Sequence, residues 1–372
     1  MSAHVLTAVS DDTAVITLDR PRALNSLSLD MVRALTSTLL AWRADDTVQA
    51  VLIRGSSDKA FCAGGDIRFF HDLGQSTPQH GSALVEDFFT EEYALNHLVH
   101  HYPKPYIALM DGVVMGGGMG VAQAGPQSRV RIVTGRTRMA MPETNIGLFP
   151  DIGASYFLPR LPGRLGLYLG ITGATIGAAD ALYAGLADHY VPADQLTGLQ
   201  AVLDADGGAS LPAAIAAFAA PFKDAAGAAA GPGALERDRA AIDHHFGAGS
   251  VPAIVASLQA DDGAFATATL ALMATRSPLM MCVAHALQER GATMNMADCL
   301  RMERAAVRRT LENGQVIEGI RALVIDKDQA PQWIPSALAN VTDAMVSQIL
   351  APVWPDHAHP LRHFHDLARA PA

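Results

Sequence analysis

Cysteine is scarce in this sequence, and its three copies form no paired motif. Cys62, Cys282 and Cys299 are separated by long stretches of chain, and no two of them have the C-x-x-C spacing. The spacing excludes a zinc ribbon and gives no indication of a disulfide framework. We therefore expect the protein to work in a reducing compartment.

Long apolar runs are also missing. No stretch of the sequence reaches the roughly 18 uninterrupted apolar residues that indicate a membrane-spanning helix. The N-terminus alternates in hydropathy and carries Asp11 and Asp12 where a signal peptide would need a basic segment and an apolar block. These absences predict a soluble protein of the cytoplasmic type with no membrane partner.

Positive charge is in deficit. The 372 residues contain 27 Lys and Arg against 37 Asp and Glu, which gives a formal net charge of −10. This balance argues against nucleic-acid binding but is compatible with a local basic pocket for an anionic ligand. Half of the residues are hydrophobic and 17% are charged, so the chain can bury a substantial core. Its length permits one large domain or a core domain with an appendage.

Strand-like and helix-like segments alternate along the first 200 residues. Residues 4–21 indicate two strands around a turn, and residues 28–45 have helical spacing with Ser28 as the expected N-cap. Several strand-like pieces end in glycine-rich chain, where α/β folds usually place their sites. Residues 205–250 are rich in Ala and Gly and predict short helices, and residues 250–325 are again helical in pattern. The whole pattern predicts an α/β fold followed by a helical region.

Three familiar motifs fail on spacing or composition. The stretch MGGGMG (115–120) does not fit G-x-G-x-x-G, because Val121 or Gln123 stands where the third glycine should be, and no Lys-Ser/Thr pair follows as in a P-loop. GASYF (153–157) lacks the closing glycine of a serine-hydrolase elbow. HLVHH (97–101) lacks the glutamate of the zinc-protease patterns and predicts an ordinary helix end.

The C-terminal tail is rich in histidine. Adventitious metal binding is one interpretation of this cluster, and a solvated tail is the interpretation that we favour. Its members are His357, His359, His363 and His365.

Two glycine-rich loops follow short strand-like pieces. One is AGGDI (63–67) and the other is MGGGMG (115–120). Glycine lets a backbone N–H approach a ligand closely, and a helix that starts at the second loop would add its positive dipole end. Tight packing of strand on helix explains either loop alone. The two loops together provide what an oxyanion hole needs.

Glu143 and Asp151 are the only acids in the apolar stretch AMPETNIGLFPDIGASYF (140–157). Each follows a proline, so both could be surface carboxylates at helix N-termini. Their neighbours favour burial instead, and a buried acid needs a partner or a task. These neighbours are Met139, Met141, Ile146, Leu148, Phe149 and Ile152. We therefore expect at least one of the two carboxylates to be buried.

Taken together, these motifs resemble the crotonase (enoyl-CoA hydratase/isomerase) superfamily. KAFCAGGDI, MGGGMG and MPETNIGLFPDIG occur in that family's order and spacing, and RPRALNSLS (20–28) matches its N-terminal stretch. Within the superfamily the chain is most similar to the 3-hydroxyisobutyryl-CoA hydrolases. That similarity includes FFTEEYALN (88–96), GLFPDIGASYFLPRLPG (147–163) and EGIRALVIDKDQAPQW (318–333). The resemblance runs over most of residues 5 to 340 and is weakest from 205 to 250.

The resemblance implies a three-part organisation. Residues 1–204 would form a spiral of β-β-α units. Residues 205–350 would form a helical region covering the acyl-CoA site, and residues 351–372 a peripheral tail.

The resemblance also implies the residues of the site. The backbone N–H groups of Gly65 and Gly117 would form the oxyanion hole, Glu143 would be the principal catalytic carboxylate, and Asp151 would position the water or the substrate 3-hydroxyl. The expected substrate contacts are Glu92, Ala63, Gly64, Asp66 and Gly116. The expected CoA contacts are of two kinds. Ala23, Ala60 and Ile67 would shape the slots for pantetheine and adenine. The basic residues Arg22, Lys59 and Lys327 would line the path of CoA, and a solvated surface role is the alternative for each of these three.

One departure from the parent family separates two reactions. Hydratases use two glutamates, and the first of those positions is Gly120 here, whereas Asp151 occupies a position that is usually not acidic in hydratases. The resemblance therefore implies hydrolysis of a short 3-hydroxyacyl-CoA, above all 3-hydroxyisobutyryl-CoA in valine breakdown. CoA enters as part of the substrate, and no cofactor or metal is expected. If Glu143 and Asp151 lie close together, their titrations are coupled and one pKa rises.

Several alternatives stay open. Glu143 can attack the thioester directly or activate water as a general base. The chain can also be a hydratase or isomerase that uses Glu143 alone, or a non-catalytic acyl-CoA-binding paralogue. Trimers are usual in the superfamily, but a helical region that caps its own subunit is compatible with a monomer.

Overall fold

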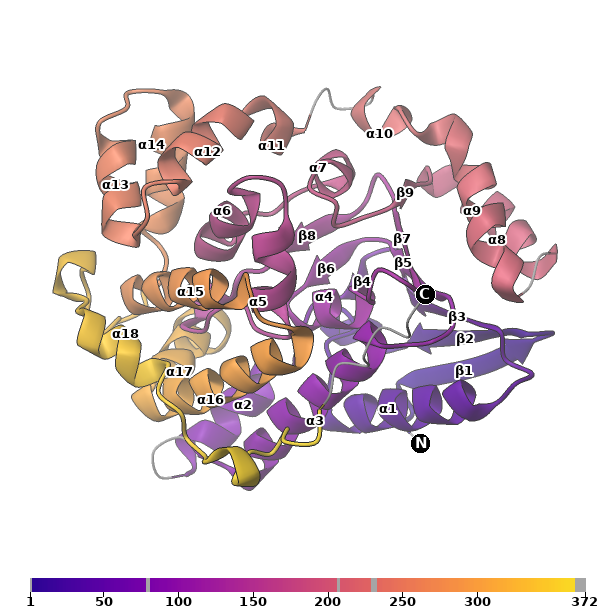
Figure 1. Ribbon diagram of the computed structural model, residues 1–372, viewed down its shortest axis with the longest axis horizontal. Coiled ribbons are helices and arrows are strands. Elements are labelled where there is room, and N and C mark those ends of the chain that lie inside the picture. The colour runs from indigo at the N-terminus through magenta and orange to yellow at the C-terminus, as the bar shows by residue number, and fades with distance from the viewer. Residues whose placement is uncertain (1, 78–80, 206–207, 229–232, 365–372) are drawn as a thin grey trace. The chain divides into compact units, whose positions relative to one another are not determined.

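The computed structural model describes residues 2–77, 81–205, 208–228 and 233–364 (Figure 1). The chain divides into two compact units whose segments alternate along the sequence. The first unit comprises Met1–Gly65, Ala94–Met139 and Ile176–Arg237. The second unit comprises Asp66–Tyr93, Ala140–Thr175 and Asp238–Ala372. The division predicted at residues 204 and 350 is a different partition and stays a prediction.

A six-stranded sheet forms the frame of the first unit, in the order β1-β2-β3-β5-β7-β9. β1 pairs antiparallel with β2, and the remaining neighbours pair parallel. The inner strands are nearly continuous buried runs, as expected of parallel strands that are covered on both faces. Figure 1 shows β1, β2 and β3 side by side. The strands are β1 (Val5–Ser10), β2 (Thr13–Leu18), β3 (Ala50–Gly55), β5 (Tyr106–Met110), β7 (Arg129–Val133) and β9 (His189–Tyr190).

A smaller sheet has the strand order β4-β6-β8. Its strands are β4 (Ala60–Cys62), β6 (Val113–Met115) and β8 (Arg138–Ala140). Each of them comes after a strand of the larger sheet in the chain and precedes a helix. These helices are α2 (Ile67–Gln75), α4 (Gly117–Ala122) and the short 3₁₀ helix η3 (Glu143–Ile146). The repeated order of strand, strand and helix confirms the predicted spiral of β-β-α units.

Helices cover the sheet of the first unit. Leu199 and Leu203 of α8 (Leu196–Ala205) and Ile215 of α9 (Leu211–Ala219) pack with Leu52 and Ile132 of the sheet. The other helices of this unit are α1 (Leu29–Ala44), α7 (Ala178–Tyr183), α10 (Ala225–Ala228) and α11 (Ala234–Arg237). α1 begins as predicted, because the Ser28 hydroxyl accepts a hydrogen bond from the Met31 N–H at 3.3 Å.

The second unit is mainly helical. α15 (Pro278–Gly291) packs against α5 (Ala154–Phe157) and α6 (Leu165–Thr172). α16 (Met296–Asn313) packs against α5, α17 (Gln315–Ile320) and α18 (Asp343–Ile349), and Figure 1 draws α15 to α18 in orange and yellow. α3 (Ala83–His100) begins in the second unit and ends in the first. The other helices are α12 (Arg239–Phe246), α13 (Val251–Gln259) and α14 (Ala264–Met273).

The histidine-rich tail departs from the sequence prediction. His359 is only 8% exposed, and its Nε2 lies 3.2 Å from the carbonyl oxygen of Arg301 in α16. The solvated-tail prediction is therefore wrong for His359, because the nearby apolar Leu361 is buried and its carbonyl accepts a hydrogen bond from Arg301 of α16. His357 and His363 are exposed as predicted, and His365 lies outside the described residues.

Among the described residues, no group of three or more His, Cys, Asp or Glu side chains has an arrangement that could hold a metal ion. No single described helix is long and apolar enough to cross a membrane. α14 and α15 meet that criterion only as a pair, bent by 109°.

Candidate active site

The first unit brings the two glycine loops together. Gly64 and Gly65 follow β4, Gly116 lies between β6 and α4, and Gly117 is the first residue of α4. Gly64 has a left-handed φ of 102°, and a Cβ there would lie 3.1 Å from the carbonyl oxygen of Met115 and 3.5 Å from the nitrogen of Gly117. Only glycine fits this conformation and this approach without strain. The loops predicted from the sequence are therefore direct neighbours.

Both proposed oxyanion donors are available. Among the described residues, neither the Gly65 N–H nor the Gly117 N–H donates a hydrogen bond to a protein acceptor. Gly117 is the first residue of α4, where helix geometry leaves N–H groups without intrahelical partners. The two N–H groups are thus available to a ligand oxygen, and their role in an oxyanion hole stays a prediction.

The N-terminal loop lies against β4. The side chain of Asn25 donates to the carbonyl of Ala60 at 2.9 Å, and the Ala63 N–H donates to the carbonyl of Leu24 at 3.0 Å. The loop residues Leu24 and Asn25 both have left-handed φ angles, so this loop turns sharply after Ala23. The predicted slot residues Ala23 and Ala60 therefore lie on neighbouring segments of the first unit.

Three acids are buried together in the second unit. Glu92 of α3, Glu143 of η3 and Asp151 are 3%, 5% and 4% exposed. Both acids of the apolar stretch are therefore buried, which confirms the expectation from their neighbours. The Tyr93 hydroxyl donates to Asp151 Oδ2 at 2.6 Å. One oxygen of Glu92 and one of Glu143 have no hydrogen-bond partner among the described residues.

Burial sets the protonation of this cluster. It raises the pKa of Glu143 well above the usual range, and the charge of Asp151 adds to the rise. Burial and Asp151 act in the same way on the pKa of Glu92. Burial also raises the pKa of Asp151 to about 6, although the hydrogen bond from Tyr93 lowers it. The coupled titration expected from the sequence is therefore present, and it includes Glu92.

The turn that follows Asp151 is unusual. Ile152 has a φ of 56° and Gly153 a φ of 88°, so two successive residues are left-handed. A β-branched residue in this region carries strain of about 1–3 kcal/mol and persists only where the surroundings hold it. The Ala154 N–H donates to the carbonyl of Asp151 at 2.9 Å and closes the turn. The backbone next to Asp151 thus has an unfavourable conformation that its tertiary contacts must stabilise.

Sequence reasoning missed two residues of this site. The first is Tyr93, whose hydroxyl donates a hydrogen bond to Asp151 and which directly follows the predicted Glu92 in the sequence. Glu303 of α16 is fully buried and accepts hydrogen bonds from the nitrogens of Gly153 and Ser155. Burial raises its pKa to about 8 against the effect of these donors. A signal for Glu303 was present, because it falls on one helix face with Met296, Leu300 and Val307.

The remaining predicted contacts are distributed over both units. Asp66 caps α2, with its side chain accepting from the Phe69 N–H at 3.5 Å, and Ile67 is half-buried at the start of that helix. The basic residues Arg22 and Lys59 of the first unit and Lys327 of the second are all exposed. Exposure is compatible with CoA binding and with a plain surface role, so their assignment stays a prediction.

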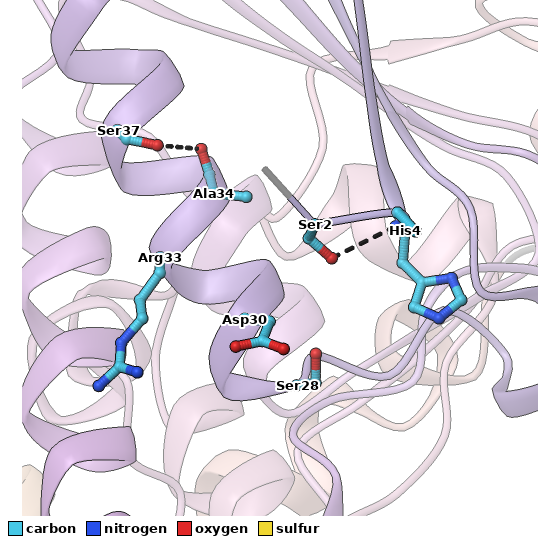
Figure 2. Close-up of a pocket in the computed structure, with 8 residues that line it drawn as sticks. Ser2, His4, Ser28, Asp30, Arg33, Ala34 and Ser37 are labelled. Atoms are coloured by element: carbon cyan, nitrogen blue, oxygen red, sulfur yellow. Dashed lines mark hydrogen bonds between the residues drawn. The ribbon is translucent and has the colours of Figure 1, made fainter.

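A pocket of about 680 Å³ in the first unit is separate from these residues. Figure 2 shows that its polar groups serve local structure, since the Ser37 hydroxyl donates to the carbonyl of Ala34 and the His4 N–H donates to the hydroxyl of Ser2. Its lining residues are Ser2, Ala3, His4, Ser28, Asp30, Arg33, Ala34 and Ser37. None of them is a predicted site residue, so the glycine loops and the acid cluster remain the candidates.

Comparison with known proteins extends over nearly the whole chain. A family model described as enoyl-CoA hydratase/isomerase matches residues 13–350. The chain is 40% identical over 335 residues to the protein named 3-hydroxyisobutyryl-CoA hydrolase, mitochondrial, of Danio rerio. The aligned region covers 90% of this chain and 86% of that protein.

Two crystal structures are similar in fold and sequence. A carnitinyl-CoA dehydratase from Mycobacterium thermoresistibile has a TM-score of 0.83 and 38% identity, and covers 95% of this chain and 98% of its own. An enoyl-CoA hydratase from Rhodobacter sphaeroides 2.4.1 has a TM-score of 0.82 and 35% identity, with coverage of 94% and 98%. The names of the three relatives all contain CoA, but they state three different reactions.

Proposed function

Because this chain belongs to the enoyl-CoA hydratase/isomerase family, we propose that it hydrolyses the thioester of a short 3-hydroxyacyl-CoA, with 3-hydroxyisobutyryl-CoA as its substrate. The products are then 3-hydroxyisobutyrate and free CoA, a step in valine breakdown. The name of the Danio rerio relative supports this substrate. The observation that carries the choice of reaction is the buried set of Glu92, Glu143 and Asp151, together with Gly120 in α4.

Gly120 supports hydrolysis over hydration. A hydratase of this superfamily would have its first catalytic glutamate at this position, and glycine has no side chain to transfer a proton. Asp151 supplies a second carboxylate at a different point of the chain. These two observations support Glu143 with Asp151 as the acid pair, the assignment that the resemblance to the hydrolases implied.

In the proposed reaction, the N–H groups of Gly65 and Gly117 bind the thioester oxygen. Their partial positive charge stabilises the oxyanion that develops on this oxygen as the carbonyl carbon becomes tetrahedral. In acyl-transfer enzymes, loss of one such donor lowers the rate about 10²–10³-fold. Both N–H groups lack a protein acceptor among the described residues of the first unit, which supports this role.

Glu143 acts in its ionised form by one of two routes. As a general base it takes a proton from water while the water oxygen bonds to the carbonyl carbon. The C–S bond then breaks, and Glu143 returns this proton to the departing sulfur, so that CoA leaves as the thiol. As a nucleophile its own oxygen attacks, CoA leaves, and water hydrolyses the mixed anhydride to restore the carboxylate. The unpartnered Glu143 oxygen is free for either route.

Glu92 and Asp151 are suited to the 3-hydroxyl of the substrate. Glu92 has a buried oxygen without a partner, and a hydroxyl group would supply the missing donor. Asp151 has one oxygen bound to Tyr93, so its other oxygen can orient the water or accept from the same hydroxyl. An acyl group without the 3-hydroxyl leaves this need unmet, which predicts selectivity for 3-hydroxyacyl groups.

The experiment compares two chemistries on one protein preparation. Release of free thiol is followed with a thiol reagent on 3-hydroxyisobutyryl-CoA, on isobutyryl-CoA, which lacks the hydroxyl, and on crotonyl-CoA, while hydration of crotonyl-CoA is followed by its absorbance. We expect thiol release from 3-hydroxyisobutyryl-CoA and no hydration. Hydration without thiol release would identify a hydratase that uses Glu143 alone, and binding without either reaction would identify a non-catalytic paralogue. The cytoplasmic location and the oligomeric state stay predictions.

A further inference from the structure

α16 reaches the turn after Asp151 through one buried carboxylate. Glu303 Oε2 accepts from the Gly153 N–H at 2.7 Å, and Oε1 accepts from the N–H and the hydroxyl of Ser155 at 2.8 and 2.6 Å. Glu303 has 0% exposure, so these three hydrogen bonds form away from solvent. Such bonds to a buried carboxyl are stronger than those between neutral groups when the carboxyl is ionised.

The turn needs this support. Ile152 and Gly153, the two residues after Asp151, are both left-handed, and Glu303 binds Gly153 itself and Ser155 shortly after it. α16 also closes over the same turn at its first residue, since a Cβ on Gly153 would come within 2.8 Å of Met296 Sδ. Contacts from Glu303 and from Met296 both hold this strained backbone in place. It therefore has little freedom to relax.

The neighbouring residue of α16 holds the other side of the acid cluster. Arg304 pairs with Glu86 and donates to the Thr90 hydroxyl at 3.1 Å, both in α3. The next residues of α3 include Glu92 and Tyr93, and Tyr93 bonds Asp151. Glu303 and Arg304 therefore secure the two segments that meet at the Tyr93–Asp151 hydrogen bond.

We propose that Glu303 is a positioning residue for the thioesterase reaction. By holding the backbone of Gly153 and Ser155, it fixes the Asp151 carboxylate against Tyr93 and beside Glu143. This inference rests on the proposed function, and it assigns to α16 a part in catalysis that contacts no substrate. Displacement of a reacting group by about 1 Å can lower a rate about 10²-fold, so the effect should be visible in kcat.

The test uses Glu303→Gln, which keeps the size of the side chain and replaces one acceptor oxygen with an N–H₂ group that cannot accept from Gly153. We expect kcat for thiol release to fall between about tenfold and 10²-fold, with KM within about threefold of wild type. Ser155→Ala removes one of three donors to Glu303 and should lower kcat less. If Glu303→Gln does not fold, Glu303→Asp keeps the charge, shortens the reach and provides the same comparison.

A matched control separates positioning from general loss of stability. Asp180 is another buried carboxylate that accepts from a backbone N–H, that of Leu235 at 2.8 Å, and it lies in the first unit. Asp180→Asn should leave kcat unchanged even if the melting temperature falls. Equal loss of kcat in both variants, or a kcat of Glu303→Gln within about twofold of wild type, would overturn the proposal.

Crystal structures of the wild type and of Glu303→Gln test the positioning role of Glu303 without any measurement of activity, and so without knowledge of the substrate. We expect the variant to lose the Tyr93–Asp151 hydrogen bond. If the wild type releases no thiol from any acyl-CoA, the proposed function fails. The structures still decide the role of Glu303, because an intact Tyr93–Asp151 bond in the variant overturns positioning and a broken bond supports it.

Discussion

The hydroxyl of Tyr93 donates a hydrogen bond to Oδ2 of Asp151 at 2.6 Å, and both side chains are buried in the second unit. The two residues are 58 positions apart in the chain, one in α3 and the other before α5. A donor to a carboxylate favours its ionised form, so Tyr93 opposes the effect of burial on Asp151. The rise in the pKa of Asp151 that burial causes is thus partly offset by a residue that carries no charge itself.

Tyr93→Phe should raise the pKa of Asp151 above its wild-type value of about 6, because the only change is loss of the stabilising donor. The measurement is a carboxyl ¹³C NMR titration with labelled aspartate, in which Asp151→Asn identifies the signal. Tyr106→Phe is the matched control, since the Tyr106 hydroxyl is buried and donates to the carbonyl of Val121. A midpoint that stays the same or falls in Tyr93→Phe would contradict the assigned role.

Glu143→Gln should lower kcat for thiol release about 10²–10⁴-fold, the range that a general base or a similar proton-transferring group contributes. The amide can neither accept a proton from water nor attack a thioester. Glu91→Gln changes a half-buried glutamate in the same unit and should leave the rate unchanged. A Glu143→Gln enzyme within a few-fold of wild type would exclude both proposed routes.

Glu143→Gln should also make the folded protein more stable than the wild type, by an amount that grows as pH rises. The folded-state pKa of Glu143 is raised above its unfolded value of 4.5, so the folded state binds more protons than the unfolded state above that pH. The wild type therefore loses more stability than the Gln variant as pH rises from about 4.5, because the other buried carboxyls titrate in both proteins but Glu143 titrates only in the wild type. We expect equal melting temperatures near pH 4 and a variant that melts about 2 °C or more higher at pH 8, by differential scanning calorimetry. A difference that is constant or shrinks with pH would contradict this assignment.

Gly118→Ala should damage the oxyanion loop. A Cβ at Gly118 would lie 2.2 Å from the carbonyl oxygen of Cys62, so α4 must move away from β4. Overpacking of this kind destabilises by about 1–3 kcal/mol, and displacement of the adjacent Gly117 N–H should also lower kcat. In Gly177→Ala the new Cβ would meet no atom within 4 Å, so stability and rate should be unchanged. Urea unfolding and the thiol assay check both variants, and a fully active Gly118→Ala enzyme would argue against the Gly117 donor.

The sequence predicted those features of the structure that depend on residues close together in the chain, such as helix caps and the burial of single side chains. Ser28 caps α1 because a hydroxyl before a helical pattern can accept from the third residue on. Glu143 and Asp151 are buried because their apolar neighbours in the chain are buried. Glu303 shares a charged helix with Glu312, which pairs with Arg308 and Arg309, and local composition does not distinguish the two glutamates. Only the position of Glu303 on the apolar face marks it.

Relations between distant segments were not predictable in the same way. The hydrogen bond from Tyr93 to Asp151 depends on how α3 packs, which no single segment specifies. The alternation of two compact units was missed because one of its boundaries falls between Tyr93 and Ala94, inside the continuous helix α3. The burial of His359 depends on its contact with Arg301, far back in the chain.

The distance along the chain between Gly153 and Glu303 has a consequence for synthesis. Glu303 leaves the ribosome 150 residues after Gly153, which at usual elongation rates is a delay of roughly 8–30 s. During this interval the nascent chain carries Glu143 and Asp151 but not the carboxylate that holds their turn. We therefore expect translation products that end before α16 to be inactive, so that the enzyme acquires activity only when its chain is nearly complete.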